Sequence, residues 1–158
     1  MNAKEGPMKK MMLPICAATI AFAAGIAIGH DHEPGVALPA KISKDDMTGK
    51  IFERPETTET VRGENTILDV TTLLSSDKKF ASGMYKSGKS RFEATEPYGV
   101  DEFMYFIEGG VTLTSADGSV QVISAGEAVT LPKEWTGIWD TDGYTKIWVI
   151  YSEDGSGL

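Results

Sequence analysis

The chain has 158 residues, which is enough for one domain with a substantial core and too few for two comfortable domains. It carries 15 Lys and Arg against 23 Asp and Glu, a formal net charge of −8 at pH 7. No basic cluster follows residue 10, so the composition argues against a nucleic-acid partner, whose phosphates need clustered Lys and Arg. The hydrophobic content of 41% is ordinary and predicts a globular fold.

Residues 1–29 have the three-part pattern of a secretory signal. A charged start precedes an apolar stretch rich in Ala and Gly, and polar HDHEPG follows at once. Residues 27–29 (AIG) fit the small-x-small rule and place cleavage before His30, while translation from Met8 would give a more typical start. The alternative is an uncleaved membrane anchor, because the stretch is close to the lower length limit for crossing a bilayer. We expect cleavage, a periplasmic or secreted protein, and no membrane association afterwards.

The sequence has one cysteine, Cys16, and it lies inside this predicted signal. Ile15 is too large for the position before the cysteine of a lipoprotein motif. The cleaved protein would therefore contain no disulfide and would depend on packing alone.

The two histidines of the chain, His30 and His32, would stand at the new N-terminus. The free amine, two backbone amides and His32 could then form a square-planar Cu(II) or Ni(II) site. The alternative is a flexible polar tip without a ligand, which the sequence favours.

Residues 30–62 lack periodicity and are rich in prolines, charges and threonines. This composition predicts an N-terminal arm or linker, with one short strand around residues 50–52. The globular domain is then expected to comprise residues 63–158.

From Thr66 onward, short β-prone runs alternate with turn signals, and no segment shows a sustained helical period. Asp117-Gly118 and Asp142-Gly143 predict tight hairpin turns, because glycine readily adopts a positive φ angle. The sequence therefore predicts a single all-β domain of about eight strands, arranged as a sandwich or barrel. The predicted strands are TILDV, FASGMYKSG, RFEATEPYG, EFMYFIEGG, VTLTSADGS, VQVISAGE, AVTLPKEW, GIWDTDG and TKIWVIY.

Two stretches resemble the two conserved boxes of the cupin family. Glu102, followed by Gly109, fits the end of the first box, and Gly126 with residues 131–132 (LP) fits the second. The passages ADGSVQVISAGEAVTLPKEWTGIWDT and YTKIWVIY look like the subfamily that includes the (S)-ureidoglycine aminohydrolase domain and the ethanolamine-utilisation cupin. The resemblance covers roughly residues 66–151. It implies a double-stranded β-helix, a jelly-roll barrel of two sheets around a central cavity.

The histidines that cupin boxes contribute to a metal site are missing. The two first-box positions fall on Glu96 and Tyr98, or on the residue before each, and the second-box position falls on Gly137. A cupin metal site normally joins several imidazoles to one carboxylate, and at most Glu102, Glu96 and the Tyr98 hydroxyl could converge here. We therefore expect no bound metal and no cofactor.

Glu102 is the central candidate residue of the first box. It is either a cavity carboxylate that orients a ligand or acts as a general base, or a structural glutamate that pairs with backbone amides or a cation. Lys146 is a candidate partner if its strand turns it inward, and otherwise a solvated residue at a strand end. Alternation puts one set of residues on the inward face: Glu96, Tyr98, Val100, Glu102, Met104 and Phe106.

Trp135, Gly137 and Trp139 also share a face of their predicted strand. A glycine between two tryptophans predicts an open space bordered by flat rings, which suits a sugar or planar ligand. We assign Trp139 to the cavity and Trp135 to the barrel mouth or a dimer interface. Phe103 and Tyr105 have the opposite parity and are expected on the outer face or against a partner chain.

Three functions follow as hypotheses. The first is an exported cupin that binds a small polar molecule in a metal-free cavity, without turnover. The second, implied by the resemblance, is an aminohydrolase-like enzyme that acts on a small nitrogenous or carbonyl compound. The third is a structural or accessory module that forms a homodimer. The predicted site has Glu102 as the catalytic group and, as ligand-binding residues, Glu96, Tyr98, Met104, Trp139 and Lys146.

Overall fold

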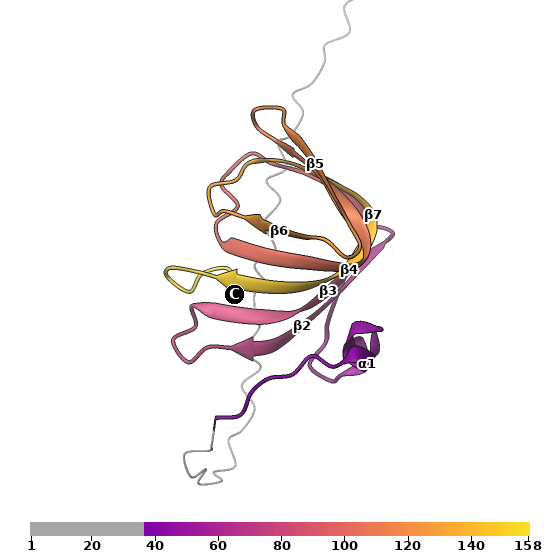
Figure 1. Ribbon diagram of the computed structural model, residues 1–158, viewed down its shortest axis with the longest axis vertical. Helices are drawn as coiled ribbons and strands as arrows, with labels where there is room; N and C mark the ends of the chain where they lie inside the picture. The colour runs from indigo at the N-terminus through magenta and orange to yellow at the C-terminus, as the bar shows by residue number, and fades with distance from the viewer. Residues whose placement is uncertain (1–36) are drawn as a thin grey trace, which may run out of the picture.

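Seven strands form one antiparallel sheet that curls over on itself (Figure 1). The computed structural model describes residues 37–158. The strand order is β1-β2-β3-β7-β4-β5, and β6 pairs with the first half of β4. This arrangement confirms the predicted all-β class. The strands are β1 Thr58–Arg62, β2 Asn65–Leu74, β3 Phe80–Ala94, β4 Asp101–Ser115, β5 Val120–Ser124, β6 Ala128–Leu131 and β7 Gly137–Tyr151.

Three strands are longer than the sequence predicted. Each of β3, β4 and β7 has 15 residues and joins two segments that were expected to be separate strands. The hairpin predicted at Asp142-Gly143 is wrong, because both residues lie inside β7. The hairpin predicted at Asp117-Gly118 is confirmed: Gly118 has a φ of 84° and its N–H donates to the Ser115 carbonyl at 2.8 Å.

A row of glycines crosses the middle of these three strands. Gly143 of β7 pairs with Gly88 of β3 on one side and with Gly110 of β4 on the other. Gly109, with a φ of 66°, lies so close to β7 that a Cβ there would collide with the Gly143 carbonyl oxygen. The β4–β7 register shifts on both sides of this row. Glycine allows such bulged, bent strands to approach closely, and Figure 1 shows the long strands curving between the β2 side and the β5 side.

Side-chain alternation on β4 divides the structure into an inner and an outer layer. Met104 and Phe106 are completely buried in the inner cluster, as predicted. Phe103 and Tyr105 lie on the outer face and are 43% and 38% exposed, which confirms their predicted parity. The inner cluster is Met104, Phe106, Val111, Leu113, Ile123, Leu131, Trp139 and Tyr144.

The predicted arm packs against the outer face of the sheet. It contains a short helix, α1 (Lys44–Met47), and a 3₁₀ turn, η1 (Lys50–Glu53), so the strand predicted at residues 50–52 is wrong. The tertiary contact explains the turn, because Ile51 is completely buried against Val70 and Met84. The following strand, β1, which the sequence pattern did not reveal, pairs with β2 at the sheet edge.

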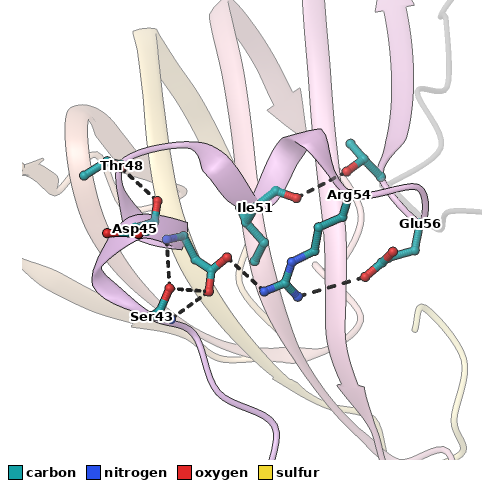
Figure 2. A network of polar contacts seen from close by, with 8 residues as sticks. Ser43, Asp45, Thr48, Ile51, Arg54 and Glu56 are labelled. Atoms are coloured by element: carbon teal, nitrogen blue, oxygen red, sulfur yellow. Dashed lines mark hydrogen bonds and ion pairs between the residues drawn. The ribbon is translucent and has the colours of Figure 1, made fainter.

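Polar contacts hold the two short helical elements together (Figure 2). The Ser43 hydroxyl accepts from the Asp46 N–H at 3.1 Å, and the Asp46 carboxylate accepts from the Ser43 N–H at 2.8 Å, which forms a capping box. Arg54 Nη2 donates to Asp46 Oδ1 at 2.9 Å. These contacts fix the first turn of α1 relative to the end of η1, so Ile51 is presented to the sheet.

Some sequence expectations fall outside residues 37–158. The predicted signal and the His30–His32 tip lie in the part of the chain that is not described. Within residues 37–158, no helix has both the length and the apolar character needed to cross a bilayer.

The glycine row leads to a prediction with a matched control. Gly109→Ala should lower the free energy of unfolding by about 3 kcal/mol or more, because the new Cβ meets backbone at a positive φ. Gly118→Ala has a similar φ but open space, so only the backbone conformation is penalised, by about 1 kcal/mol. Urea unfolding of both variants measures the difference. Equal losses would contradict a tight strand contact at Gly109.

Candidate functional site

A buried ion pair lies inside the curled sheet. Lys146 Nζ is 2.6 Å from Glu102 Oε1, and the two residues are 5% and 3% exposed. The Tyr98 hydroxyl donates to the other carboxylate oxygen, Glu102 Oε2. Lys146 is therefore turned inward, and it is the partner that the sequence analysis sought for Glu102.

The strand register explains how these two residues meet. Glu102, Met104 and Phe106 share the inner face of β4, and Phe106 is the direct cross-strand partner of Lys146 on β7. The lysine side chain extends past Met104, whose Sδ lies 3.0 Å from Nζ, to reach Glu102. The length of the lysine side chain thus spans the four-residue offset between the charged positions.

Three aromatic rings surround the ammonium group. Lys146 Nζ lies 5.4 Å from the ring centroids of Tyr85 and Trp139, and 5.8 Å from that of Tyr144. These distances allow cation–π attraction, which is stronger for a desolvated cation. Tyr85 and Tyr144 stack at 5.9 Å, and Trp139 and Tyr144 meet at 5.7 Å. We refer to Tyr85, Trp139 and Tyr144 as the aromatic cage.

Asp69 is a second carboxylate near the pair, and the sequence analysis missed it. It is half-buried on β2, and its Oδ1 accepts a hydrogen bond from Trp148 Nε1 at 3.1 Å. Burial raises the pKa of Asp69 to about 6; Trp148 and the positive charge of Lys146 oppose the rise, and the negative charge of Glu102 adds to it. The available signal was an aspartate inside the β-prone run TILDV, since aspartate is depleted in strands.

Trp139 carries an unsatisfied hydrogen-bond donor. It is 2% exposed, and its Nε1 is the one buried side-chain nitrogen or oxygen in residues 37–158 that has no hydrogen-bond partner. The other two indoles are satisfied, since Trp148 donates to Asp69 and Trp135 donates to Ser115 Oγ at 3.2 Å. Native interiors leave few donors unpaired, so this one requires an explanation.

The sequence from the end of β2 to the middle of β7 matches a known family. Residues 74–146 match the family described as the EutQ-like cupin domain. This part of the chain is a EutQ-like cupin domain. The comparison with curated proteins gives no significant match.

Solved structures support the same cupin fold. The EutQ protein of Clostridium difficile is 22% identical, with 63% of this chain and 78% of that one covered and a TM-score of 0.50. A protein of unknown function from the DUF861 family of Pseudomonas syringae pv. tomato is 16% identical, covers 60% and 43%, and has a TM-score of 0.54. The ectoine synthase of P. lautus is 15% identical, covers 65% and 72%, and has a TM-score of 0.51. At these identities the likeness shows the jelly-roll cupin fold and nothing finer.

The residues of this cupin domain do not fit a metal ion. Among residues 37–158, no three His, Cys, Asp or Glu side chains come close enough together to hold one. Both oxygens of Glu102 already have donors, since Oε1 accepts from Lys146 and Oε2 accepts from Tyr98. The positive charge beside this carboxylate is thus an ammonium group that the chain itself supplies.

Of the other predicted site residues, Tyr98 lies at the buried pair and Glu96 does not. Glu96 is exposed in the loop between β3 and β4, so it does not belong to the buried cluster. Tyr98 lies between Glu102 and Trp135, whose ring it meets edge-on at 6.3 Å. The open space predicted at Gly137 is wrong, because a Cβ there would collide with the Thr114 carbonyl and the Trp135 ring.

Removing one member of the ion pair should be costly. Lys146→Met leaves the Glu102 carboxylate buried without its cation and should lower the free energy of unfolding by about 3–5 kcal/mol. The double variant with Glu102→Gln should lose much less than the sum of the single variants, because neither charge is then buried alone. Urea unfolding of the wild type, the two single variants and the double variant gives the coupling energy between Lys146 and Glu102.

The exposed pair of Lys89 and Asp142, 2.7 Å apart, is the control for this cycle. Lys89→Met should have a much smaller effect, since water already solvates both groups. A Lys146→Met variant as stable as Lys89→Met would contradict the role assigned to the buried pair.

Asp69 should make stability depend on pH in an unusual direction. Its folded-state pKa of about 6 lies above the ordinary value of 3.8, so the folded protein holds this proton more tightly than the unfolded chain does. The contribution of Asp69 therefore weakens as pH rises from about 4 to 6. Asp69→Asn keeps an acceptor for Trp148 but has no proton to lose.

The variant and the wild type should be about equally stable below pH 4, and the variant should gain about 3 kcal/mol by pH 7. Urea unfolding of both proteins across this pH range measures the difference in their stability. The exposed carboxylates titrate in both proteins, so their effect on stability cancels in this difference. A difference that does not vary with pH would show that Asp69 has an ordinary pKa.

Proposed function

We propose that this protein is an exported cupin that binds a small polar molecule inside its barrel, beside the Lys146–Glu102 pair. The unsatisfied Trp139 N–H is the observation that carries the proposal. It is almost fully buried, and the ammonium group of Lys146 lies over the same indole ring at 5.4 Å. A ligand acceptor at this place would satisfy the donor.

The buried charges give independent support. Taking a lysine and a glutamate out of water has a large desolvation penalty, and apolar residues of similar volume often give equal or better stability. An interior that served only as a scaffold would have no need of the pair. A polar ligand supplies a reason for an ammonium, two carboxylates and an indole N–H to lie together in the barrel.

Tyr98 suggests the entrance. It belongs to the loop between β3 and β4, and backbone hydrogen bonds tie this loop to the turn before β7, from Tyr98 N to Trp135 O and from Gly99 N to Lys133 O. Tyr98 is half-buried, whereas the other groups that contact Glu102 are fully buried. Movement of this loop would free one oxygen of Glu102 for a ligand.

An acid–base enzyme is the second candidate, and Asp69 is the observation that favours it. A carboxylate with a pKa of about 6 exchanges its proton close to neutral pH, as a general acid or base must. Glu102, the acid–base group expected from the sequence, already accepts from two donors. Asp69 therefore replaces Glu102 as the residue to test if turnover is found.

Export and dimer formation complete the proposal. The charged start and apolar stretch of residues 1–29, followed by the polar residues 30–35, support export with removal of the signal. The exposed outer rings of Phe103 and Tyr105 support a homodimer that pairs through the outer face of β4.

A thermal-shift screen of small sugars, amides, amines and acids tests the binding proposal. A compound at about 100 times its Kd should stabilise the protein by about 2.7 kcal/mol. Lys146→Met removes the polar centre and should abolish the shift, with Trp139→Phe as a second interior variant if Lys146→Met does not fold. Phe103→Ala, one residue from Glu102 but on the outer face, should keep it.

No shift with any compound would overturn the proposal, as would a shift that both interior variants retain. Analysis of each binding compound for chemical change after incubation separates the binding module from the enzyme.

A further inference from the structure

One hydrogen-bond donor on the inner face has no acceptor among the described residues. Lys146 donates to Glu102 Oε1 and approaches the weak acceptor Sδ of Met104, while Trp139 Nε1 has no acceptor. Both oxygens of Glu102 are engaged, since Oε1 accepts from Lys146 and Oε2 accepts from Tyr98. The missing partner of Trp139 is therefore an acceptor, and a ligand that offers only N–H donors does not meet the need.

The charges around the cage limit what kind of acceptor can enter. Three charged side chains lie together here, from three different strands: Lys146 on β7, Glu102 on β4 and Asp69 on β2. One ammonium group thus faces two carboxylates. An anionic ligand would bring a third negative charge into a poorly solvated interior with one positive charge, which is unfavourable. A neutral oxygen acceptor avoids this repulsion.

The neighbours of Trp139 already occupy its ring. Phe92 stacks on its ring at 6.0 Å with an interplanar angle of 11°, and Lys146 Nζ lies over the ring at 5.4 Å. Tyr144 packs against it at a tilt. A planar ligand stacked on Trp139, as the sequence suggested, would compete with these neighbours. Recognition through the N–H at the ring edge leaves the contacts of Phe92 and Lys146 with the ring in place.

We infer that the ligand is a small neutral carbonyl compound, an amide or a ketone, whose oxygen accepts the Trp139 indole N–H beside Lys146. This inference rests on the proposed binding function and names its ligand class. The carbonyl oxygen supplies the acceptor that the interior lacks, and it carries no charge to oppose Glu102 and Asp69.

The indole N–H signals of the ¹⁵N-labelled protein test the inference directly. The three tryptophans give three indole signals, and Trp139→Phe identifies the one from Trp139. Three probes of similar size are titrated: acetamide as the neutral carbonyl, acetate as the anion and ethylammonium as the cation. Acetamide should move the Trp139 signal downfield in a saturable manner and leave the signals of Trp135 and Trp148 in place.

Two variants sharpen the measurement. Trp139→Phe keeps a ring but lacks the donor, so acetamide should bind at least about tenfold more weakly, as expected for the loss of one buried hydrogen bond. Trp135→Phe is the matched control, since its N–H already donates to Ser115, and it should bind acetamide as the wild type does.

Three outcomes would overturn the inference, and they differ in what they leave of the proposed function. A selective, saturable shift of the Trp139 signal with acetate or ethylammonium, but not with acetamide, refutes the carbonyl class and leaves the binding function standing. A thermal-shift ligand that does not move the Trp139 signal does the same. If no probe moves this signal and the screen finds no ligand, the inference and the proposed function both fail.

Discussion

The buried ion pair of Lys146 on β7 and Glu102 on β4 is the constraint around which the interior of this cupin domain is arranged. Two opposite charges in a protein interior are tolerated only when good geometry and further hydrogen bonds offset their lost hydration. Tyr98 supplies the second hydrogen bond to Glu102, and the aromatic cage supplies ring faces to Lys146. The conformation of the loop that carries Tyr98 and the packing of the cage are both consequences of this constraint.

The glycine row makes the enclosed interior possible. The strands β3, β7 and β4 bend where Gly88, Gly143 and Gly110 lie opposite one another. On one side of the bend β3 pairs with β2, and on the other side β4 pairs with β5. The inner faces of the two halves then meet. Lys146 and Tyr144 stand on one side of the bend and Trp139 on the other, so the cage itself exists only because the strands bend between them.

The features that a sequence can predict are those that depend on local alternation. The period of two assigned Met104 and Phe106 to the inside and Phe103 and Tyr105 to the outside, and the structure confirms both. The cupin boxes indicated the fold. The local sequence around a glycine, by contrast, does not show whether the chain reverses there in a turn or continues as a bent strand. Asp142-Gly143 therefore looked like a hairpin, although cross-strand contact with Gly110 decides its conformation.

The remaining parts of the site depend on register, which local sequence does not encode. Lys146 meets Glu102 because β7 pairs with β4 in one alignment, and Asp69 joins them because β2 and β3 place it opposite Tyr85. The same holds for the arm, where Ile51 forms part of a 3₁₀ turn because it packs on Val70 and Met84. Each of these residues is ordinary in sequence and becomes distinctive through a partner from a distant strand.

The chemical character of the site follows from the kind of cation that stands beside Glu102. An ammonium group on a lysine side chain is fixed to β7, donates hydrogen bonds and is enclosed by rings, so it contributes directed N–H groups. Around it lie an indole N–H without an acceptor and carboxylates that already have partners or repel anions. No buried side chain supplies an acceptor to the Trp139 N–H. Such a site therefore recognises a ligand by the hydrogen-bond acceptor that the ligand brings.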